Sequence, residues 1–320
     1  MSLSDLHERV QRIKGEAIAV VGDLMLDRFV WGKVSRISPE APVPVVEVER
    51  ESFHLGGAAN VARNLESLGV TPLLLGVVGD DEASSQLRQA LRDRGLSDDA
   101  VVDDSTRRTT VKTRIIAGSQ QVVRADWESV TDLNGDVEAR ALDALADIVG
   151  RARAVVLSDY AKGTLTPRVI ARAIELAKAR AIPILVDPKL RRYRLYQGVT
   201  LVTPNLSEAA RFAGLAVSTD DDIAQTASSI LDELGCTAVL ITRGEQGMTL
   251  FETGQSPHHI PAFAREVFDV SGAGDTVIAA AALALAAGAS LPEAAELANR
   301  AAGVVVGKLG TATVELGELV

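Results

Sequence analysis

The sequence reads Asp269-Val270-Ser271-Gly272-Ala273-Gly274-Asp275-Thr276 immediately before an apolar run, Val277–Ala287. Glycine permits close backbone approach and unusual φ and ψ angles. A helix that begins at such a turn presents unpaired N–H groups and a positive dipole end to an anion. Asp275 would lie beside that anion as a base, which is what phosphoryl transfer to an alcohol requires. The alternative is an ordinary turn with an N-capping aspartate, and the turn alone does not separate the two.

Short apolar runs alternate with helical patterns along most of the chain. This alternation predicts βαβ units and a parallel sheet that is covered on both faces. The strand-like runs are Ala17–Val21, Pro72–Val78, Ala154–Leu157, Ile182–Val186, Thr200–Val202 and Ala238–Ile241. The helical patterns are Asp136–Val149, Pro167–Ala179, Asp220–Leu234 and a last helix at Ala294–Val306.

Polar residues follow four of these strands, namely Asp23, Asp159, Asp187 and Thr242. In open α/β sheets, ligands gather at the carboxyl ends of the strands, so these side chains are expected to face one crevice. For each residue taken singly, a strand-terminating turn or a helix cap is the alternative.

Two stretches break the α/β rhythm. Residues Phe29–Phe53 contain several prolines followed by an alternating run, and Arg108–Arg124 alternates as well. Alternation predicts β-strands, and the prolines suit an edge or irregular strand. We expect a small β-appendage on the α/β body, which serves as a lid over a ligand or as a subunit interface.

The composition restricts the class of protein. The chain has 320 residues and a net charge of −10, which argues against nucleic acid as a partner. Cys236 is the single cysteine, so an internal disulfide is excluded. The first residues lack an apolar signal core, and the longest apolar run, Val277–Ala289, is too short to span a bilayer. We therefore expect a cytoplasmic protein without a membrane partner.

A second glycine-rich element begins at Gly56-Gly57 and continues as Ala58-Ala59-Asn60-Val61-Ala62-Arg63-Asn64-Leu65, closing at Leu68-Gly69. The pattern predicts a helix of small residues with Asn60 in its first turn. Small side chains let a ligand approach the backbone, and Asn60 offers a donor and an acceptor to hydroxyls. Tight packing of the helix against a sheet is the alternative.

Together, the two glycine-rich elements resemble the signature motifs of the ribokinase-like (PfkB) carbohydrate kinases. Asn205-Leu206-Ser207-Glu208 resembles the family's Asn-x-x-Glu motif, and Thr242-Arg243-Gly244-Glu245-Gln246-Gly247 resembles its nucleotide-contacting glycine loop. The resemblance covers the whole chain. It implies a single domain over residues 1–320 with a three-layer α/β/α body, a mostly parallel central sheet and a small β-lid formed by about residues 29–53 and 108–124.

The closest likeness within that family is to the D-glycero-β-D-manno-heptose-7-phosphate kinases of lipopolysaccharide heptose biosynthesis. Four stretches carry this likeness: Gly22–Arg28, Ser35–Val45, Ser158–Gly163 and Val186–Lys189. The third stretch departs from the pattern at Ala161, where a glycine is expected. The resemblance implies transfer of the γ-phosphoryl of ATP to O1 of the heptose 7-phosphate. Because the chain ends at Val320, we expect a stand-alone kinase without a C-terminal nucleotidyltransferase domain.

The resemblance also implies roles at the phosphoryl-transfer centre. Asp275 is the expected base, and the N–H groups of Gly272, Ala273 and Gly274 are expected to stabilise the moving phosphoryl group. Mg²⁺ is expected with ATP, ordered through water by Asn205 and Glu208. Adenine is expected between Gly244 and the segment Asn299 to Gly310. The expected nucleotide-binding residues are Asn205, Leu206, Ser207, Glu208, Thr242, Arg243, Gly244, Gly247, Ser271, Asn299 and Gly303.

Sugar hydroxyls are expected to contact Asp23, Gly56, Gly57 and Asn60. Asp159 is a further candidate, for which a strand-end cap is an equally good explanation. The 7-phosphate requires cations, and the candidates are Arg63, Lys112, Arg124 and Lys189, of which Lys189 and Arg124 are favoured. The exposed valines of the first lid stretch favour a homodimer that pairs its lids. Two other functions stay open: a kinase for another sugar, sugar phosphate or nucleoside, and a non-catalytic sugar-binding regulator on the same fold.

Overall fold

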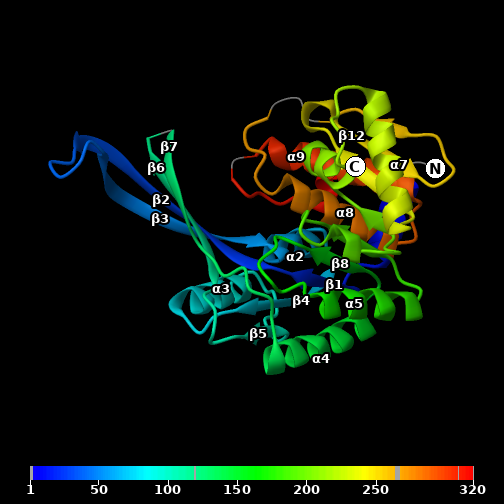
Figure 1. Ribbon diagram of the computed structural model, residues 1–320, viewed down its shortest axis with the longest axis horizontal. Helices are drawn as coiled ribbons and strands as arrows, with labels where there is room; N and C mark the ends of the chain where they lie inside the picture. The colour runs from blue at the N-terminus through cyan, green and yellow to red at the C-terminus, as the bar shows by residue number, and fades with distance from the viewer. Residues whose placement is uncertain (1–2, 119, 264–266, 309, 320) are drawn as a thin grey trace.

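The computed structural model in Figure 1 describes residues 3–118, 120–263, 267–308 and 310–319. Ser119, within the expected lid range 108–124, and Leu309, within the segment expected near adenine, lie outside these residues. The chain forms a nine-stranded sheet and a four-stranded sheet. The strands of the larger sheet are β1 (Ala17–Gly22), β4 (Thr71–Val78), β5 (Val101–Asp103), β8 (Val155–Ser158), β9 (Ile184–Asp187), β10 (Leu201–Val202), β11 (Ala238–Thr242), β12 (Met248–Glu252) and β13 (His258–Ile260).

The large sheet is mostly parallel, as expected from the βαβ alternation. Its strand order is β13-β12-β11-β10-β9-β8-β1-β4-β5, and only the pairings of β12 with β11 and β13 are antiparallel. Successive residues of β1 enter opposite cores: Ile18 and Val20 join one, and Ala19 and Val21 join the other. The sheet is therefore buried on both faces, which explains its continuous apolar strands.

Helices cover both faces of this sheet and complete a three-layer α/β/α body (Figure 1). One layer contains α1 (Leu3–Arg12), α2 (Ala58–Ser67), α3 (Glu82–Arg92), α8 (Ala273–Ala286) and α9 (Leu291–Val306). The other contains α4 (Gly135–Arg151), α5 (Pro167–Ala179), α6 (Leu206–Ala213) and α7 (Asp220–Leu234). The short 3₁₀ helices are η1 (Tyr193–Leu195), η2 (Gly244–Gln246) and η3 (Leu316–Leu319).

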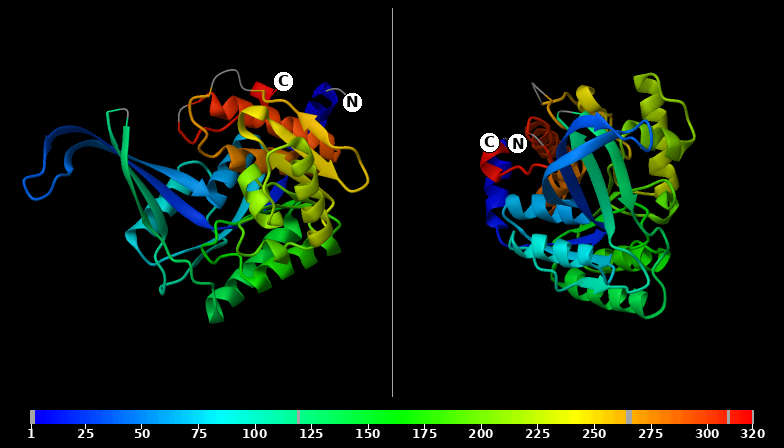
Figure 2. Two further views of the ribbon diagram at one scale, coloured as in Figure 1. Left: turned by 45° about the horizontal axis from the view of Figure 1, so that its top comes forward. Right: turned by 90° about the vertical axis from the view of Figure 1, so that its left-hand side faces the viewer.

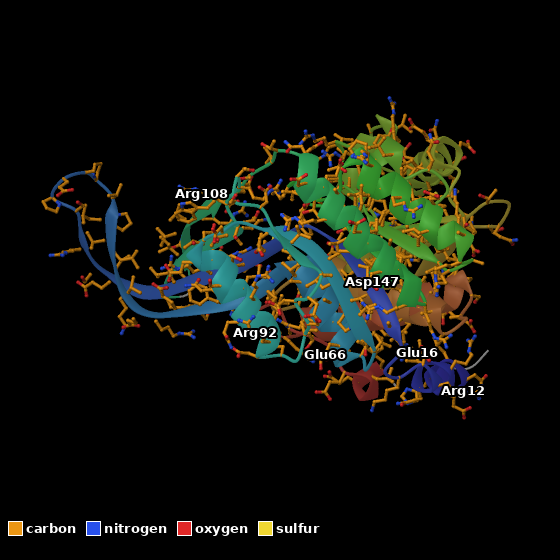
Figure 3. All side chains as sticks on the ribbon, turned by 90° about the horizontal axis from the view of Figure 1, so that it is seen from below. Arg12, Glu16, Glu66, Arg92, Arg108 and Asp147 are labelled. Atoms are coloured by element: carbon orange, nitrogen blue, oxygen red, sulfur yellow. The ribbon has the colours of Figure 1, made fainter. Side chains whose placement is uncertain are left out.

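The covering helices turn their charged faces outward, whereas α8 is enclosed. Arg92 of α3 and Asp147 of α4 lie on the outside of the body (Figure 3). In α8, every residue from Asp275 to Ala284 is buried, as is typical of a helix that is apolar all round. Its many alanines let α2 and α9 pack closely on it, which explains how a core with so few aromatic residues is filled.

The smaller sheet projects from the body as a curved arm, seen in Figure 1 and in the left view of Figure 2. We call it the β-lid. It consists of β2 (Leu24–Ile37), β3 (Pro44–Gly57), β6 (Thr110–Ala117) and β7 (Gln120–Trp127) in the order β3-β2-β6-β7. These strands extend beyond the expected ranges, because β2 starts one residue after β1, β3 runs directly into α2 and β7 continues to Trp127. The prolines are accommodated because Pro39 and Pro42 lie between the strands and Pro44 begins the edge strand β3.

The order of the strands places a crevice between β1 and β8. From β1 the chain proceeds through β4 to β5 on one side, whereas β8 to β11 follow one another on the other side. Neighbouring strands whose connections depart in opposite directions leave a crevice at their carboxyl ends, where ligands bind in α/β folds. Asp23 directly follows β1 and Asp159 directly follows β8, so both lie at this crevice.

Candidate active site

The first turn of α8 carries Asp275, which is 4% exposed. Asn60 of α2 donates from Nδ2 to Asp275 Oδ2 at 2.8 Å, and the hydroxyl of Tyr160 donates to Asp275 Oδ1 at 2.9 Å. Gly272 precedes the helix in the left-handed region at φ 81°, and a Cβ on it would lie 2.7 Å from Asn60 Nδ2. The glycine is therefore required both for the turn and for the approach of Asn60.

The surroundings of Asp275 make it a stronger base than an exposed aspartate. Burial raises the pKa of Asp275 to about 6, and the hydrogen bonds from Asn60 and Tyr160 oppose this rise. The group is ionised at neutral pH but accepts a proton readily, which suits a general base.

The backbone donors at this turn are not all available. The N–H of Ala273 donates to the carbonyl of Val270 at 3.2 Å, and the N–H of Ser271 donates to Asp269 Oδ1 at 2.8 Å. Gly274 occupies the second helical position, where an N–H has no partner within its helix. Of the expected phosphoryl-binding donors, Ala273 is thus already engaged in this structure, whereas Gly274 can receive an anion.

The second glycine-rich element, Gly56-Gly57, lies at the junction of β3 and α2, next to the β2 residues that follow Asp23. Gly57 has φ 58° and directly precedes α2, and a Cβ there would lie 2.4 Å from the carbonyl oxygen of Asp23. A Cβ on Gly56 would lie 2.6 Å from Asp27 Oδ2. Both glycines therefore allow β2 and β3 to approach each other. Asn60 is buried and its Oδ1 has no hydrogen-bond partner within the described residues, so this oxygen is free to accept from a substrate hydroxyl.

Asp23 and Asp159, the acids at the crevice, are largely occupied by the protein. The carboxylate of Asp23 accepts from the backbone N–H groups of Tyr160, Lys162 and Thr164 at 2.9, 2.9 and 3.0 Å. Asp159 accepts from the N–H of Ala161 at 2.7 Å and from the hydroxyl of Tyr196 at 2.7 Å. A carboxylate offers about four acceptor positions, so Asp23 retains about one. The geometry of Asp159 matches the strand-end alternative.

The loop that follows β8 carries Tyr160, which lies within the stretch Ser158–Gly163 but was not expected to contact Asp275. Tyr160 contacts Asp275, and burial holds the pKa of its phenol well above the ordinary value, so it stays protonated and donates. Its neighbour Ala161 has φ 57°, a left-handed conformation that costs a non-glycine residue about 1 kcal/mol. This explains why a glycine is expected at position 161.

The four candidate cations are in different surroundings. The ammonium groups of Lys112 and Lys189 lie 5.7 and 5.4 Å from the ring centroid of Tyr160. The guanidinium of Arg63 donates to the carbonyl of Thr311, and burial lowers the pKa of Arg63 to about 10. Arg124 pairs with Asp126 at 3.0 Å and its side chain is 50% exposed. The structure therefore gathers Lys112 and Lys189 near Asp275 but leaves Arg124, one of the two favoured residues, in a surface pair.

Two further acids lie in this region: Asp187, which the strand-end pattern had placed at the crevice, and Asp27, which the sequence did not single out. Asp27 is buried on β2 and pairs with Arg114 of β6 at 2.5 Å. Burial raises the pKa of Asp187 to about 7, and Lys189 opposes this rise. Neither the pairing across the β-lid nor the burial of a strand-end acid has a local signal, although alternation along β6 puts Lys112 and Arg114 on one face.

The Asn-x-x-Glu motif begins α6 as a capping box. Asn205 Oδ1 accepts from the N–H of Glu208 at 2.9 Å, and Glu208 Oε2 accepts from the N–H of Asn205 at 3.1 Å. The hydroxyl of Ser207 also donates to Asn205 Oδ1 at 2.9 Å, and Leu206 is partly buried at the start of the helix. Lys189 forms an ion pair with the other oxygen of Glu208. A cavity of about 370 Å³ adjoins these residues and Tyr160.

The glycine loop lies at the end of β11. Thr242 is the last residue of this strand and bridges to Asn205, which links the loop to the Asn-x-x-Glu motif. Gly244 and Gly247 have φ 60° and 81°, and a Cβ on Gly247 would lie 2.1 Å from the carbonyl of Ile260. Arg243 binds Asp220 at 2.6 Å and lines a cavity of about 650 Å³ next to α7.

The α9 residues expected near adenine lie on the far side of β12 and β13. The amide of Asn299 donates to the carbonyl of Pro261 at 2.8 Å, and Gly303 is partly buried one turn later. Because Asn299 contacts the backbone next to β13, α9 and the glycine loop flank the same pair of strands.

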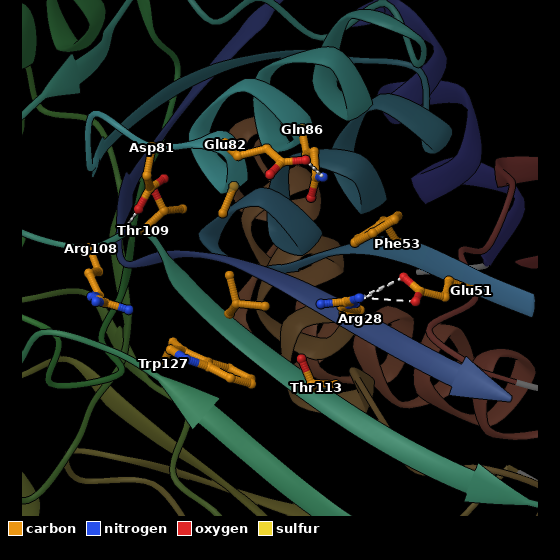
Figure 4. Close-up of a pocket in the computed structure, with 12 residues that line it drawn as sticks. Arg28, Glu51, Phe53, Asp81, Glu82, Gln86, Arg108, Thr109, Thr113 and Trp127 are labelled. Atoms are coloured by element: carbon orange, nitrogen blue, oxygen red, sulfur yellow. Dashed lines mark hydrogen bonds and ion pairs between the residues drawn. The ribbon is translucent and has the colours of Figure 1, made fainter. Parts of the chain in front are cut away.

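A separate cavity of about 540 Å³ lies behind the β-lid, between it and the start of α3 (Figure 4). Arg28 forms an ion pair with Glu51 at 2.8 Å on its wall, and Asp81 accepts from the N–H of Thr109 at 2.9 Å. Val111 and Thr113 line it, whereas Lys112, which lies between them on β6, lies over the ring of Tyr160. The cavity is thus on the opposite face of the β-lid from the candidate site.

In the part of the chain that the structure describes, no cluster of three or more His, Cys, Asp or Glu side chains is arranged to hold a metal ion. No helix among these same residues is both long and apolar enough to cross a membrane.

The family model described as pfkB family carbohydrate kinase matches residues 16–316. The chain belongs to the pfkB family of carbohydrate kinases. Bifunctional protein HldE of Paramagnetospirillum magneticum is 48% identical over 318 residues, which cover 99% of this chain and 65% of that protein. Bifunctional protein HldE of Caulobacter vibrioides is 52% identical over 307 residues, which cover 95% of this chain and 63% of that protein. The chain spans 65% and 66% of the length of the two relatives from Paramagnetospirillum magneticum and Pelobacter propionicus.

Solved structures of other pfkB-like kinases share the fold. Ribokinase of Arabidopsis thaliana, solved in complex with ribose and ATP, superposes with a TM-score of 0.75 at 22% identity and covers 96% of this chain and 97% of its own. Phosphofructokinase-2 of Escherichia coli, in complex with potassium, superposes with a TM-score of 0.78 at 20% identity over 96% and 97%. The expected ribokinase-like fold is thereby confirmed.

Proposed function

We propose that this protein transfers the γ-phosphoryl group of ATP to O1 of D-glycero-β-D-manno-heptose 7-phosphate and forms the 1,7-bisphosphate. The observation that carries the proposal is the buried Asp275 at the first turn of α8, held by two donors and accompanied by the ammonium groups of Lys112 and Lys189. The choice of sugar follows the likeness of the four stretches around Asp23, Ser35, Asp159 and Asp187 to heptose-7-phosphate kinases. The HldE relatives, with identities of 47–52%, support that choice.

The residues of the chain then have distinct parts in the reaction. Asp275 accepts the O1 proton as the phosphoryl group is transferred. The free N–H of Gly274, at the positive end of α8, stabilises charge on the phosphoryl oxygens. Asn60 Oδ1 and the remaining acceptor position of Asp23 bind sugar hydroxyls. ATP lies along the glycine loop and α9, among the expected nucleotide-binding residues.

The carboxylate of Glu208 fits a hard cation. Asn205 and Glu208 offer the oxygen donors that Mg²⁺ prefers, and a bound Mg²⁺ would neutralise charge on the ATP phosphates. Lys189 pairs with Glu208 in this structure. When Glu208 instead faces the cation through water, the ammonium group of Lys189 becomes available to a phosphate. Lys112, on the β-lid, is the proposed partner of the 7-phosphate.

A coupled ADP-release assay tests the proposal over a panel of heptose 7-phosphate, unphosphorylated heptose, ribose and fructose 6-phosphate. We expect the heptose 7-phosphate to have the highest kcat/KM. The unphosphorylated heptose should be poorer by about 10²-fold or more, because it leaves the partly buried ammonium group of Lys112 without its proposed anionic partner.

Other outcomes of the panel would overturn the proposal. Strong turnover of ribose or fructose 6-phosphate with none of the heptose 7-phosphate would assign another kinase of the same fold. Absence of ADP release with every sugar, although sugar binding is measurable, would indicate a non-catalytic regulator. The D275N variant gives the background rate of ADP release.

We also propose a homodimer that pairs the β-lids. Val43, Val48 and Val123 of the β-lid are 52%, 55% and 48% exposed, and Trp127 beside the cavity behind it is 43% exposed. Apolar surface of this kind on an edge-bearing sheet favours association. Light scattering at micromolar concentration should give twice the chain mass, and V48E, which places a charge on the exposed edge strand, should shift it toward the single-chain mass. A single-chain mass for the unaltered protein would contradict this.

A further inference from the structure

Tyr160 occupies a position that combines three kinds of contact. Its hydroxyl donates to Asp275 at 2.9 Å, its backbone N–H donates to Asp23 at 2.9 Å, and its ring meets the ammonium groups of Lys112 and Lys189. A tyrosine that only filled the core would need none of these. Tyr160 therefore connects Asp275, the proposed base, to Asp23 at the crevice and to the two lysines, Lys112 on the β-lid and Lys189 on the body.

The loop that carries Tyr160 is anchored on both sides. Asp23 accepts from the N–H groups of Tyr160, Lys162 and Thr164, and Asp159 accepts from that of Ala161. Both carboxylates are about 1% exposed, so water does not compete for these bonds. The backbone from which the ring of Tyr160 projects is therefore held in place.

The carboxylate of Asp275 is held at both oxygens. Asn60 of α2 donates to Oδ2 and Tyr160 donates to Oδ1. Rotation about the Cβ–Cγ bond would break both hydrogen bonds, and each oxygen keeps about one acceptor position for a substrate hydroxyl. Since a small misplacement of a reacting group costs a large factor in rate, this double restraint matters to turnover.

The ring of Tyr160 has a second effect. An ammonium group in direct contact with a carboxylate stabilises its ionised form and weakens it as a base. Lys112 and Lys189 meet the ring instead, and Lys189 pairs with Glu208. The neutral phenol thus gives Asp275 a hydrogen bond that carries no charge, while Lys189 acts on the carboxylate only through its field and lowers its pKa.

We propose that Tyr160 is the positioning residue of Asp275: its hydroxyl sets the direction of the carboxylate, and its ring separates that carboxylate from Lys112 and Lys189. The inference rests on the proposed function, in which Asp275 is the base. Other charged groups around Asp275 are Asp27 from β2, Arg63 from α2, and Asp187 and Lys189 after β9. These groups are unchanged in the variants below.

The test compares Y160F, which loses only the hydroxyl, with Y160L, which also loses the ring. With ATP and heptose 7-phosphate, we expect Y160F to lower kcat by about 10–100-fold with KM for ATP within about 2-fold, because the base is misdirected. The acid limb of the kcat profile should move to higher pH in Y160F, since a donor to the ionised form is lost. In Y160L the limb should return toward lower pH, because the lysines can then reach the carboxylate.

A second readout does not depend on turnover. The difference in unfolding free energy between each parent and its D275N derivative, measured against pH, reports the titration of Asp275. Its midpoint should be higher in the Y160F background than in the unaltered background. This measurement distinguishes the two proposals, because it stays informative even if no sugar on the panel is phosphorylated.

Y193F is the matched control. Tyr193 is also buried and donates its hydroxyl to a carboxylate, Glu233 of α7, at 2.5 Å. Y193F should leave kcat and the acid limb unchanged within about 2-fold. The proposal is overturned if Y160F keeps both its kcat and the midpoint of the Asp275 titration, or if Y160F and Y193F change them equally.

Discussion

Asp275→Asn should lower kcat by about 10²–10⁴-fold while ATP binding is retained, because the proposed proton acceptor is lost but the backbone of the α8 turn is not. The amide fits the same space. Its oxygen can accept from Asn60 Nδ2, and its NH₂ can donate to the hydroxyl of Tyr160, which turns from donor to acceptor. Turnover with heptose 7-phosphate and ATP affinity by calorimetry provide the two measurements.

The same substitution should stabilise the protein at alkaline pH. The pKa of Asp275 is about 6 when folded and 3.8 ordinarily, so the folded state binds more protons than the unfolded state between these values. Stability therefore falls as pH rises through this window. The free-energy cost of keeping the buried carboxylate ionised, of the order of 2–3 kcal/mol, is fully present above pH 6. D275N should be more stable in urea than the parent at pH 8, and the gain should disappear near pH 4.

Either half of this result can fail separately. Unchanged turnover in D275N would remove Asp275 from the mechanism. Equal stability of parent and variant at pH 8 would mean that the buried carboxylate carries no penalty. A gain in stability with a loss of activity is typical of active sites that keep a charged group out of water.

Asp23→Ala should be the most destabilising single change in the site. It removes the acceptor of three backbone N–H groups, those of Tyr160, Lys162 and Thr164, at a carboxylate that is 1% exposed. Each unsatisfied buried donor costs about 1–3 kcal/mol, so the expected loss for three donors is about 3–9 kcal/mol. Turnover should fall as well, because the same loop holds the hydroxyl of Tyr160. Urea unfolding and kcat are the measurements.

Two variants make this prediction specific. D23N keeps one oxygen and should retain part of the stability, which provides a measurable protein if D23A does not fold. Asp222 also accepts from two backbone N–H groups, those of Ser218 and Thr219, but it is only partly buried. D222A should be much less damaging, because water replaces the lost acceptor. A D23A protein that unfolds like the parent but has a raised KM for the sugar would show Asp23 to be a ligand only.

Much of the fold was predictable because the signals lie close together in the chain. The helices expected at Pro167–Ala179 and Asp220–Leu234 occur without a shift at either end. Thr166 caps the first and Pro167 begins it, and a capping box at Thr219 and a left-handed Gly235 bound the second. These devices act within four residues, so the sequence displays them directly.

The candidate site was predictable in its motifs but not in its contacts. Lys189 and Arg124 had equal support as phosphate ligands, yet only Lys189 lies near Tyr160, whereas Arg124 pairs with its neighbour Asp126 on an exposed part of β7. Ala161 looked like a minor departure, but its left-handed backbone makes glycine the unstrained choice. Both outcomes depend on burial and backbone angle, which no spacing reveals.

The sequence by itself determined the alternation of strands and helices in most of the body, the glycine turn at Gly272 and the placement of Asp275 in the first turn of α8, because each depends on neighbouring residues. Only the tertiary structure decided what Asp275 touches. Asn60 and Tyr160 are 215 and 115 residues away from it in the chain, and they meet it because the sheet reverses its winding between β1 and β8. That reversal depends on the packing of the whole core, so the environment of the base is a property of the fold.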